Sequence, residues 1–112
     1  MWVFLTHGFV SVVQHKDEPG MYQVKSRASK VLEQLWPDEE IQVIEWADYR
    51  FRISLQKEKV LGVLSRVADS IGYSSFKNEC RDDQDYLESL GRIWNIMLDY
   101  QSKLELEERG RQ

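Results

Sequence analysis

The sequence predicts an α+β domain in which helices cover one face of an antiparallel sheet. Two patterns indicate this class: short runs of aromatic and β-branched residues dominate the chain up to Leu55, and helical repeats of apolar residues dominate it afterwards. The 112 residues are 42% hydrophobic and 30% charged, which is typical of a globular protein. A chain of this size can bury one core, so we expect a single domain.

The first half of the chain contains the predicted strands. They occupy residues 2–6, 9–15, 21–26, 41–46 and 49–55. The first two flank His7-Gly8 and indicate a hairpin or one bulged strand. Pro19-Gly20 is typical of a turn. The alternation is clearest in the last strand, where it places Phe51 and Ile53 toward the core and Arg52 on the opposite face.

Three helices follow from apolar residues spaced three and four apart. We expect them at residues 28–36, at 57–71 with Gly72 as a stop, and from about 82–85 onward. Charged residues predict fraying of the helix after Ser102. We therefore expect a domain over residues 1–102 and a frayed, charged tail over residues 103–112. From Met21 the order is a ferredoxin-like β-α-β-β-α run, with extra N-terminal strands before it and a C-terminal helix after it.

The same patterns predict which side chains form the core. Six are expected to be mostly buried: Phe51, Ile53, Leu64, Val67, Ile93 and Trp94. On the strand after Gly20, Tyr22 and Val24 are expected to point inward, which directs Lys25 outward. This register sends the basic residues of two strands to the same uncovered face.

Several short blocks together are similar to a known family. They are Gly8-Phe9-x-Ser11-Val12-Val13, Asp17, Val24-Lys25-Ser26-Arg27, Asp48-Tyr49-Arg50-Phe51-Arg52, Ile71-Gly72-Tyr73-x-x-Phe76-Lys77, Tyr86 and Trp94-x-x-Met97-x-x-x-Gln101. In this order they resemble a family of short, uncharacterised bacterial and phage-borne proteins, over nearly the whole chain to Gln101. The resemblance implies one compact domain and no particular activity. Relatives often carry Arg where Lys16 and Lys25 stand here, which keeps the charge but changes the geometry of anion contacts.

No pattern of residues indicates catalysis or metal binding. The sequence lacks the Gly-x-Ser-x-Gly, His-Glu-x-x-His and phosphate-loop motifs. His7 and His15 have no third ligand, so we expect no metal, no cofactor and no enzymatic activity. The single cysteine, Cys80, is typical of a cytoplasmic protein. The broken apolar run at the N-terminus predicts neither a signal peptide nor a membrane partner.

The leading functional hypothesis is based on four cations that the strand register sends to the uncovered sheet face: Lys25, Arg27, Arg50 and Arg52. Lys77, in the loop after Gly72, extends the predicted site. Such a face suits nucleic acid, a nucleotide phosphate or an acidic protein surface, because guanidinium groups pair well with phosphates and carboxylates. The alternative is that Glu45 and Asp48 neutralise the arginines. No aromatic side chain is clearly placed on this face, which disfavours RNA.

The predicted C-terminal helix offers a second class of function. Although the whole chain carries only −4, its segment from Asn78 to Glu108 has nine acids and three bases. Most of the apolar stripe of the helix should close the core, but Tyr100 and Leu104 extend past it. We therefore retain two main hypotheses, which salt sensitivity separates, and a minimal hydrolase built around His15 as a third and weaker one. One is a small phage or mobile-element binding protein with an anionic partner; the other is an interaction module or inhibitor, as a homodimer, acting through Trp94, Met97, Tyr100 and Leu104.

Overall fold

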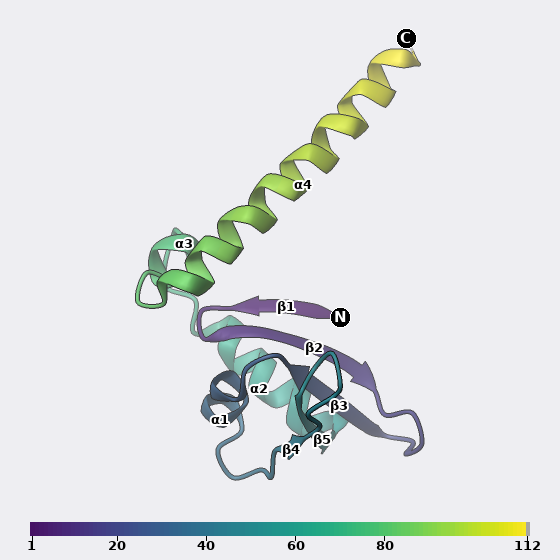
Figure 1. The fold of residues 1–112 in the computed structure, drawn as a ribbon, viewed down its shortest axis with the longest axis vertical. Coiled ribbons are helices and arrows are strands. Elements are labelled where there is room, and N and C mark those ends of the chain that lie inside the picture. The colour runs from purple at the N-terminus through teal and green to yellow at the C-terminus, as the bar shows by residue number, and fades with distance from the viewer. Residues whose placement is uncertain (112) are drawn as a thin grey trace. The chain divides into compact units, whose positions relative to one another are not determined.

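The computed structural model describes residues 1–111 and confirms the α+β class. Its contacts divide the chain into two compact units, one from Met1 to Tyr73 and the other from Ser74 onward. The first unit holds the whole sheet and two helices, and the second holds two further helices (Figure 1).

The first unit is built on a five-stranded antiparallel sheet. Its strands are β1 (Trp2–Leu5), β2 (Gly8–Gln14), β3 (Met21–Ser26), β4 (Gln42–Val43) and β5 (Phe51–Gln56). They lie in the order β1-β2-β3-β5-β4, and every neighbouring pair is antiparallel (Figure 1). Leu5 pairs with Gly8, so the N-terminal segment is a hairpin and not one bulged strand.

Alternate side chains of the strands meet two helices on one face of this sheet. The helices are α1 (Ser29–Leu35) and α2 (Lys57–Asp69). The core comprises Leu5, Val10, Val12, Val24, Val31, Leu32, Trp36, Ile53, Leu55, Val60 and Val63. Tyr22, Phe51, Leu64 and Val67 are partly buried against it. The predicted inward register of β3 and β5 is therefore confirmed.

Two glycines permit the tight connections of this unit. Gly8 has a φ of +145°, and an added Cβ there would lie 3.1 Å from Cβ of Val31, so glycine allows α1 to approach the hairpin closely. Gly20 has a φ of +79° in the turn before β3, a conformation that side chains with a Cβ rarely adopt.

The segment before β5 differs from its predicted structure. A strand was expected over residues 41–46, but only Gln42 and Val43 pair with β5. Trp46 is 89% exposed in the following turn. The Asp48 carboxylate accepts a hydrogen bond from the Tyr49 main-chain N–H in this turn, and the strand expected from Tyr49 begins at Phe51.

The second unit contains α3 (Phe76–Glu79) and α4 (Gln84–Gly110). Asp83 is the N-cap of α4, and its side chain accepts a hydrogen bond from the Tyr86 N–H at 3.1 Å. The helix continues to Gly110 through the segment expected to fray. Contacts one turn apart support this segment, for example the 3.0 Å hydrogen bond from Gln101 to Glu105.

Burial in the second unit is lower than the sequence predicts. Leu90 and Cys80 are its buried residues among those described, and Ile93 is half-buried. Trp94 is 58% exposed, so its predicted place in the core is wrong. The apolar spacing of α4 predicted a core-facing stripe, but periodicity does not say whether another element covers the stripe.

Candidate functional site

The sheet register brings two of the predicted cations side by side. Lys25 in β3 lies directly opposite Arg52 in β5. The same row continues to Gln42 beyond Arg52, and through Ser11 to Trp2 on the other side. Because the neighbouring residues Val24 and Ile53 point into the core, this row lies on the opposite side of the sheet, called the outer face below.

Arg52 and Lys25 have no carboxylate partner within residues 1–111. The guanidinium of Arg52 donates through Nη2 to the main-chain oxygen of Tyr49 at 2.9 Å. Its Nε is buried and has no hydrogen-bond acceptor among the described residues. A buried donor without an acceptor is costly, so the fold tolerates this nitrogen at an expense in stability.

Glu45 and Asp48 were expected to neutralise the arginines, and one of these ion pairs forms. Arg50 forms an ion pair with Glu45 at 2.6 Å. Arg27 instead donates to the main-chain oxygen of Asp48 at 2.9 Å, while the Asp48 carboxylate accepts from Tyr49. In the described part of the chain, the charges of Lys25, Arg27 and Arg52 are thus not compensated by an ion pair.

Four aromatic rings form one connected group that reaches Arg27, and the sequence analysis did not place them there. Phe4 and Phe9 stack with ring centroids 4.6 Å apart. Trp2 meets Phe9 edge-on at 6.0 Å, and Tyr49 lies 6.3 Å from Phe9. The Arg27 guanidinium lies 4.6 Å from the Tyr49 ring centroid. The rings connect the β1–β2 hairpin to the basic residues.

We call the seven residues of this surface the outer-face cluster: Trp2, Phe4, Phe9, Lys25, Arg27, Tyr49 and Arg52. Trp2 is 71% exposed and Arg27 is exposed, whereas the other members are half-buried. The half-buried members are held by their neighbours, so the surface is largely preorganised. The signal for Trp2 and Phe4 was available in the sequence, because both alternate with the inward residues Val3 and Leu5.

The remaining predicted site residues belong to the second unit. The ammonium of Lys77 lies 5.9 Å from the ring centroid of Trp94. Met97, Tyr100 and Leu104 are 55%, 54% and 43% exposed on α4. These three residues and Trp94 are therefore accessible, as a partner-binding role requires.

Cys80 has the features of a structural thiol. Burial, and to a smaller extent the nearby charge of Glu79, raises the pKa of Cys80 above the ordinary thiol value. Burial also raises the pKa of Tyr86, with smaller effects from Cys80 and Asp83. A buried thiol that resists ionisation is a poor nucleophile, so this group does not suit covalent catalysis.

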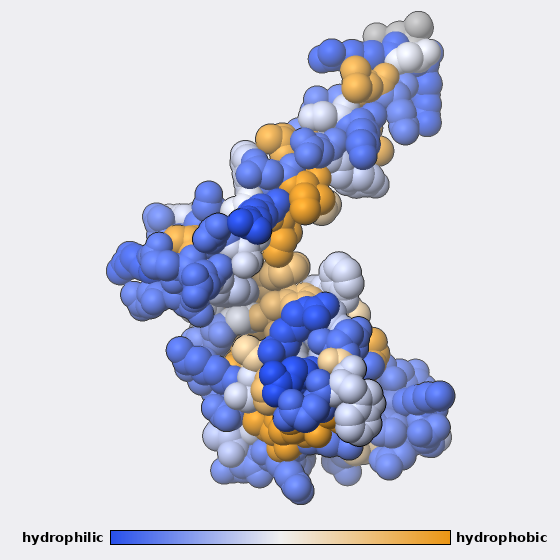
Figure 2. Space-filling model, in the orientation of Figure 1, coloured by the Kyte–Doolittle hydropathy of each residue, from blue (hydrophilic) through white to orange (hydrophobic). Residues whose placement is uncertain are grey.

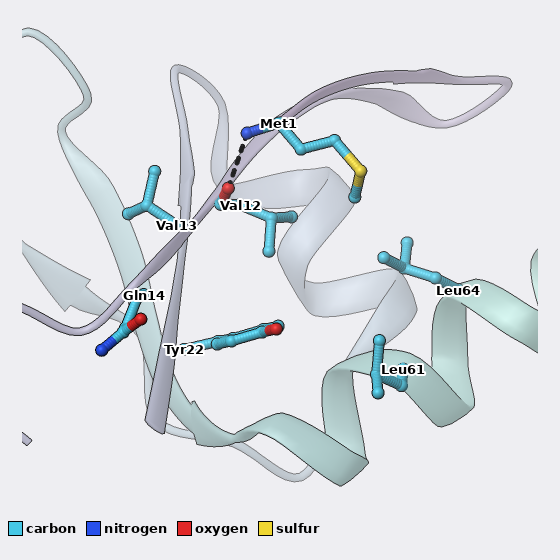
Figure 3. A pocket seen from close by; sticks show the side chains of 7 residues that line it. All are labelled: Met1, Val12, Val13, Gln14, Tyr22, Leu61 and Leu64. Carbon is cyan, nitrogen blue, oxygen red and sulfur yellow. Dashed lines mark hydrogen bonds between the residues drawn. The ribbon is translucent and has the colours of Figure 1, made fainter. Parts of the chain in front are cut away.

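A cavity of about 310 Å³ lies between the sheet and α2 in the first unit (Figure 3). Its lining consists of Met1, Val12, Val13, Gln14, Tyr22, Leu61 and Leu64. The amino group of Met1 donates to the Val12 carbonyl at 2.8 Å beside it. No side chain of this lining is acidic or basic, and the charged group beside it, the Met1 ammonium, already donates to the Val12 carbonyl.

The histidines form no metal centre within residues 1–111. No three of the described His, Cys, Asp and Glu side chains are arranged to hold an ion. Nδ1 of His15 accepts hydrogen bonds from the main-chain N–H groups of Asp17 and Glu18, at 3.1 and 3.2 Å. His15 therefore stabilises the turn between β2 and β3.

Comparisons with protein families, characterised proteins and solved structures find no match to this chain. Among the helices of residues 1–111, none combines the length and the apolar character needed to cross a lipid bilayer.

Proposed function

We propose that this protein binds single-stranded nucleic acid on the outer face of its sheet. The observation that carries the proposal is the meeting of aromatic rings and uncompensated cations on one surface. Trp2 is exposed beside the stacked Phe4 and Phe9, and it lies in the same row of the sheet as Lys25 and Arg52. Rings accept unpaired bases by stacking, and cations bind the phosphates that connect them.

The magnitudes favour a ligand that uses both kinds of residue. Stacking of one base on an aromatic ring contributes about 1–3 kcal/mol, whereas an exposed ion pair contributes about 0–1 kcal/mol. A bare phosphate gains nothing from the aromatic rings. An unpaired strand reaches both, because neighbouring strands lie about 4.8 Å apart and β1 to β5 therefore span about 14 Å.

Duplex nucleic acid suits this face less well. Bases in a duplex are stacked on one another, so a flat sheet with aromatic rings cannot use their faces. The chain also carries a net charge of −4, so it has no overall attraction for a phosphate backbone. Binding must then come from local contacts with cations that form no ion pair in the described part of the chain, such as Lys25 and Arg52.

The basic residues are tested by fluorescence anisotropy with labelled oligo-dT, oligo-U and a duplex of the same length. We expect both single strands to bind more tightly than the duplex. The double variant Lys25→Ala/Arg52→Ala should weaken binding and reduce the slope of log K against log salt by about 1.4, as the loss of two phosphate contacts requires. The control is Lys30→Ala/Arg66→Ala, which removes the same charge from α1 and α2.

The aromatic residues are tested by Trp2→Ala, with Trp46→Ala as the control for loss of an exposed tryptophan. Trp2 is 71% and Trp46 89% exposed, so neither change should disturb folding. We expect Trp2→Ala to weaken oligonucleotide binding about 5- to 100-fold and Trp46→Ala to leave it unchanged. If Trp2→Ala binds like the wild type and polyglutamate binds as well as oligo-dT, the ligand is an acidic protein surface instead.

A further inference from the structure

Helix α4 presents far more apolar surface than its own unit buries. The helix has 27 residues, yet Leu90 is its one buried residue, and every residue from Trp94 to Gly110 is exposed. Apolar residues recur along the helix in the space-filling view (Figure 2). Helices in proteins gain most of their stability from packing of an apolar face, so an exposed apolar face of this length indicates a docking surface.

Four apolar residues form one stripe that follows a heptad spacing. Ile93, Met97, Tyr100 and Leu104 are separated by four, three and four residues, which places them on one side of the helix. Trp94 and Ile96 flank them and are 58% and 64% exposed. This spacing is typical of helices that pair side by side, where the two central positions of each heptad contact the other helix.

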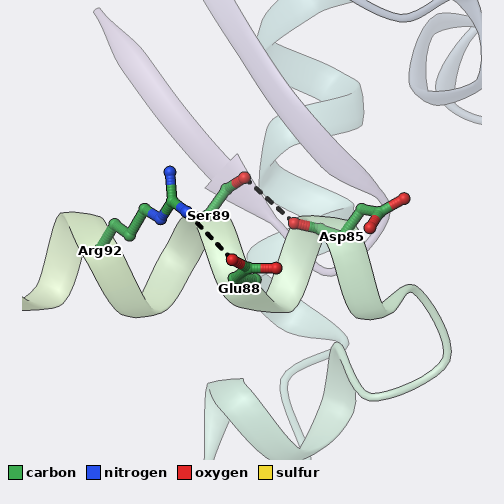
Figure 4. Close-up of polar contacts among 4 residues, drawn as sticks. All are labelled: Asp85, Glu88, Ser89 and Arg92. Atoms are coloured by element: carbon green, nitrogen blue, oxygen red, sulfur yellow. Dashed lines mark hydrogen bonds and ion pairs between the residues drawn. The ribbon is translucent and has the colours of Figure 1, made fainter.

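Polar contacts occupy another side of α4. Arg92 donates to Glu88 at 3.0 Å, and the Ser89 hydroxyl donates to the main-chain oxygen of Asp85 at 3.0 Å (Figure 4). The ion pair joins residues one turn apart and lies away from the stripe. The helix therefore has a polar side for water and an apolar side for a second helix.

The charges beside the stripe indicate which second helix fits. Lys103 and Glu108 are five residues apart and lie on opposite sides of the stripe. Neither forms an ion pair within the described residues. When two copies of such a helix pair in parallel, Lys103 of one copy faces Glu108 of the other, and the symmetry makes this contact twice.

An antiparallel arrangement of two copies suits the same residues less well. It would bring Lys103 beside Ile96 of the other helix and Glu108 beside Leu87, so charged groups would face apolar ones. Of the other described helices, α1 and α3 have 7 and 4 residues, too short to match the stripe along its length, and α2 already buries Val60 and Val63 in the core of the first unit. The sequence of α4 therefore suits parallel pairing with the same helix of a second copy.

We propose that two copies of this chain form a parallel dimer through Ile93, Met97, Tyr100 and Leu104 of α4. The stripe covers about two heptads and ends before Glu107, whose charge would meet the same charge of the second copy. This short length makes the dimer reversible, with dissociation expected in the micromolar range. The proposal is independent of nucleic-acid binding, which involves the first unit.

The test measures the mass of the full chain by sedimentation equilibrium over a dilution series. We expect the wild type to approach twice the 13.3 kDa of one chain at high concentration and to dissociate on dilution. Met97→Glu should abolish the dimer. Leu106→Glu is the matched control, because Leu106 is 65% exposed on the same helix but lies off the stripe. Far-UV circular dichroism at low concentration verifies that both variants fold.

A charge exchange tests the parallel arrangement. Lys103→Glu and Glu108→Lys should each weaken the dimer, and the double variant should restore it, because the pair is remade with reversed signs. A wild type that stays monomeric at all concentrations overturns the proposal. So does a Met97→Glu variant that dimerises as well as Leu106→Glu. If the single variants weaken the dimer and the double variant does not restore it, the parallel arrangement is wrong. If Met97→Glu destabilises the monomer, the stripe is covered within one chain.

Discussion

The two compact units use similar apolar patterns with different results. In the first unit, α2 repeats apolar residues along one side and buries Val60 and Val63 against the sheet. In the second unit, α4 repeats them over twice the length, and Met97 and Tyr100 stay exposed. The difference shows that an apolar stripe on a helix predicts packing against another element but does not identify that element. The sheet supplies that partner for α2, and we propose a second chain for α4.

The largest effect is expected where the first unit is most tightly packed. Ile53 is 2% exposed in β5, and Ile53→Ala should lower the free energy of unfolding by about 2–5 kcal/mol, because it removes buried contacts and leaves a cavity. Its neighbour Ser54 is exposed on the other face, so Ser54→Ala should change stability by less than about 0.5 kcal/mol. Urea titration measures both. A loss below about 1 kcal/mol for Ile53→Ala would contradict the register.

The next effect tests how closely α1 approaches the hairpin. Gly8→Ala combines a strained backbone with a Cβ only 3.1 Å from Cβ of Val31, and should cost about 1–3 kcal/mol. Gly20→Ala is the matched control, since it has the strained φ but no atom within 4 Å of the added Cβ. Thermal unfolding should show the greater loss for Gly8→Ala. Equal losses would mean that Val31 does not restrict this position.

A smaller effect of opposite sign is expected in the second unit. Gly91 lies inside α4, and an added Cβ there meets no atom within 4 Å. Gly91→Ala should therefore stabilise the helix by about 0.5–1 kcal/mol, because glycine loses more backbone freedom on folding. Far-UV circular dichroism and thermal unfolding measure the gain. A loss of stability would show that the helix is packed closely at Gly91, unlike the exposed segment after Trp94.

The smallest effect concerns pH. The pKa of Cys80 is raised in the folded chain, so folding favours the protonated thiol. The stability that depends on the protonated Cys80 thiol is present in full below the ordinary thiol pKa of 9.0. It is lost as the pH rises through the raised pKa that Cys80 has in the folded chain. Urea unfolding followed by circular dichroism should therefore show less loss of stability between about pH 8 and about pH 10 for Cys80→Ala than for the wild type. An identical loss would show that Cys80 is not buried.

Local pattern was sufficient for much of the first unit. The alternation of Phe51, Ile53 and Leu55 with Arg52 predicted which face of β5 is covered, because a strand directs successive side chains to opposite faces. The spacing of apolar residues likewise predicted α1 and α2. The strand expected over residues 41–46 is mostly a turn, because pairing in a sheet depends on a neighbouring strand and not on the segment alone.

The outer-face cluster required both kinds of information. The sequence by itself determined that Lys25 and Arg52 point away from the core, since each adjoins an inward residue in its own strand. Only the tertiary structure decided that these two lie opposite each other, that Glu45 pairs with Arg50, and that the rings of Trp2, Phe9 and Tyr49 form one group reaching Arg27. The physical reason is that alternation fixes the side of a strand locally, whereas register and side-chain pairing depend on hydrogen bonds and contacts between segments far apart in the chain.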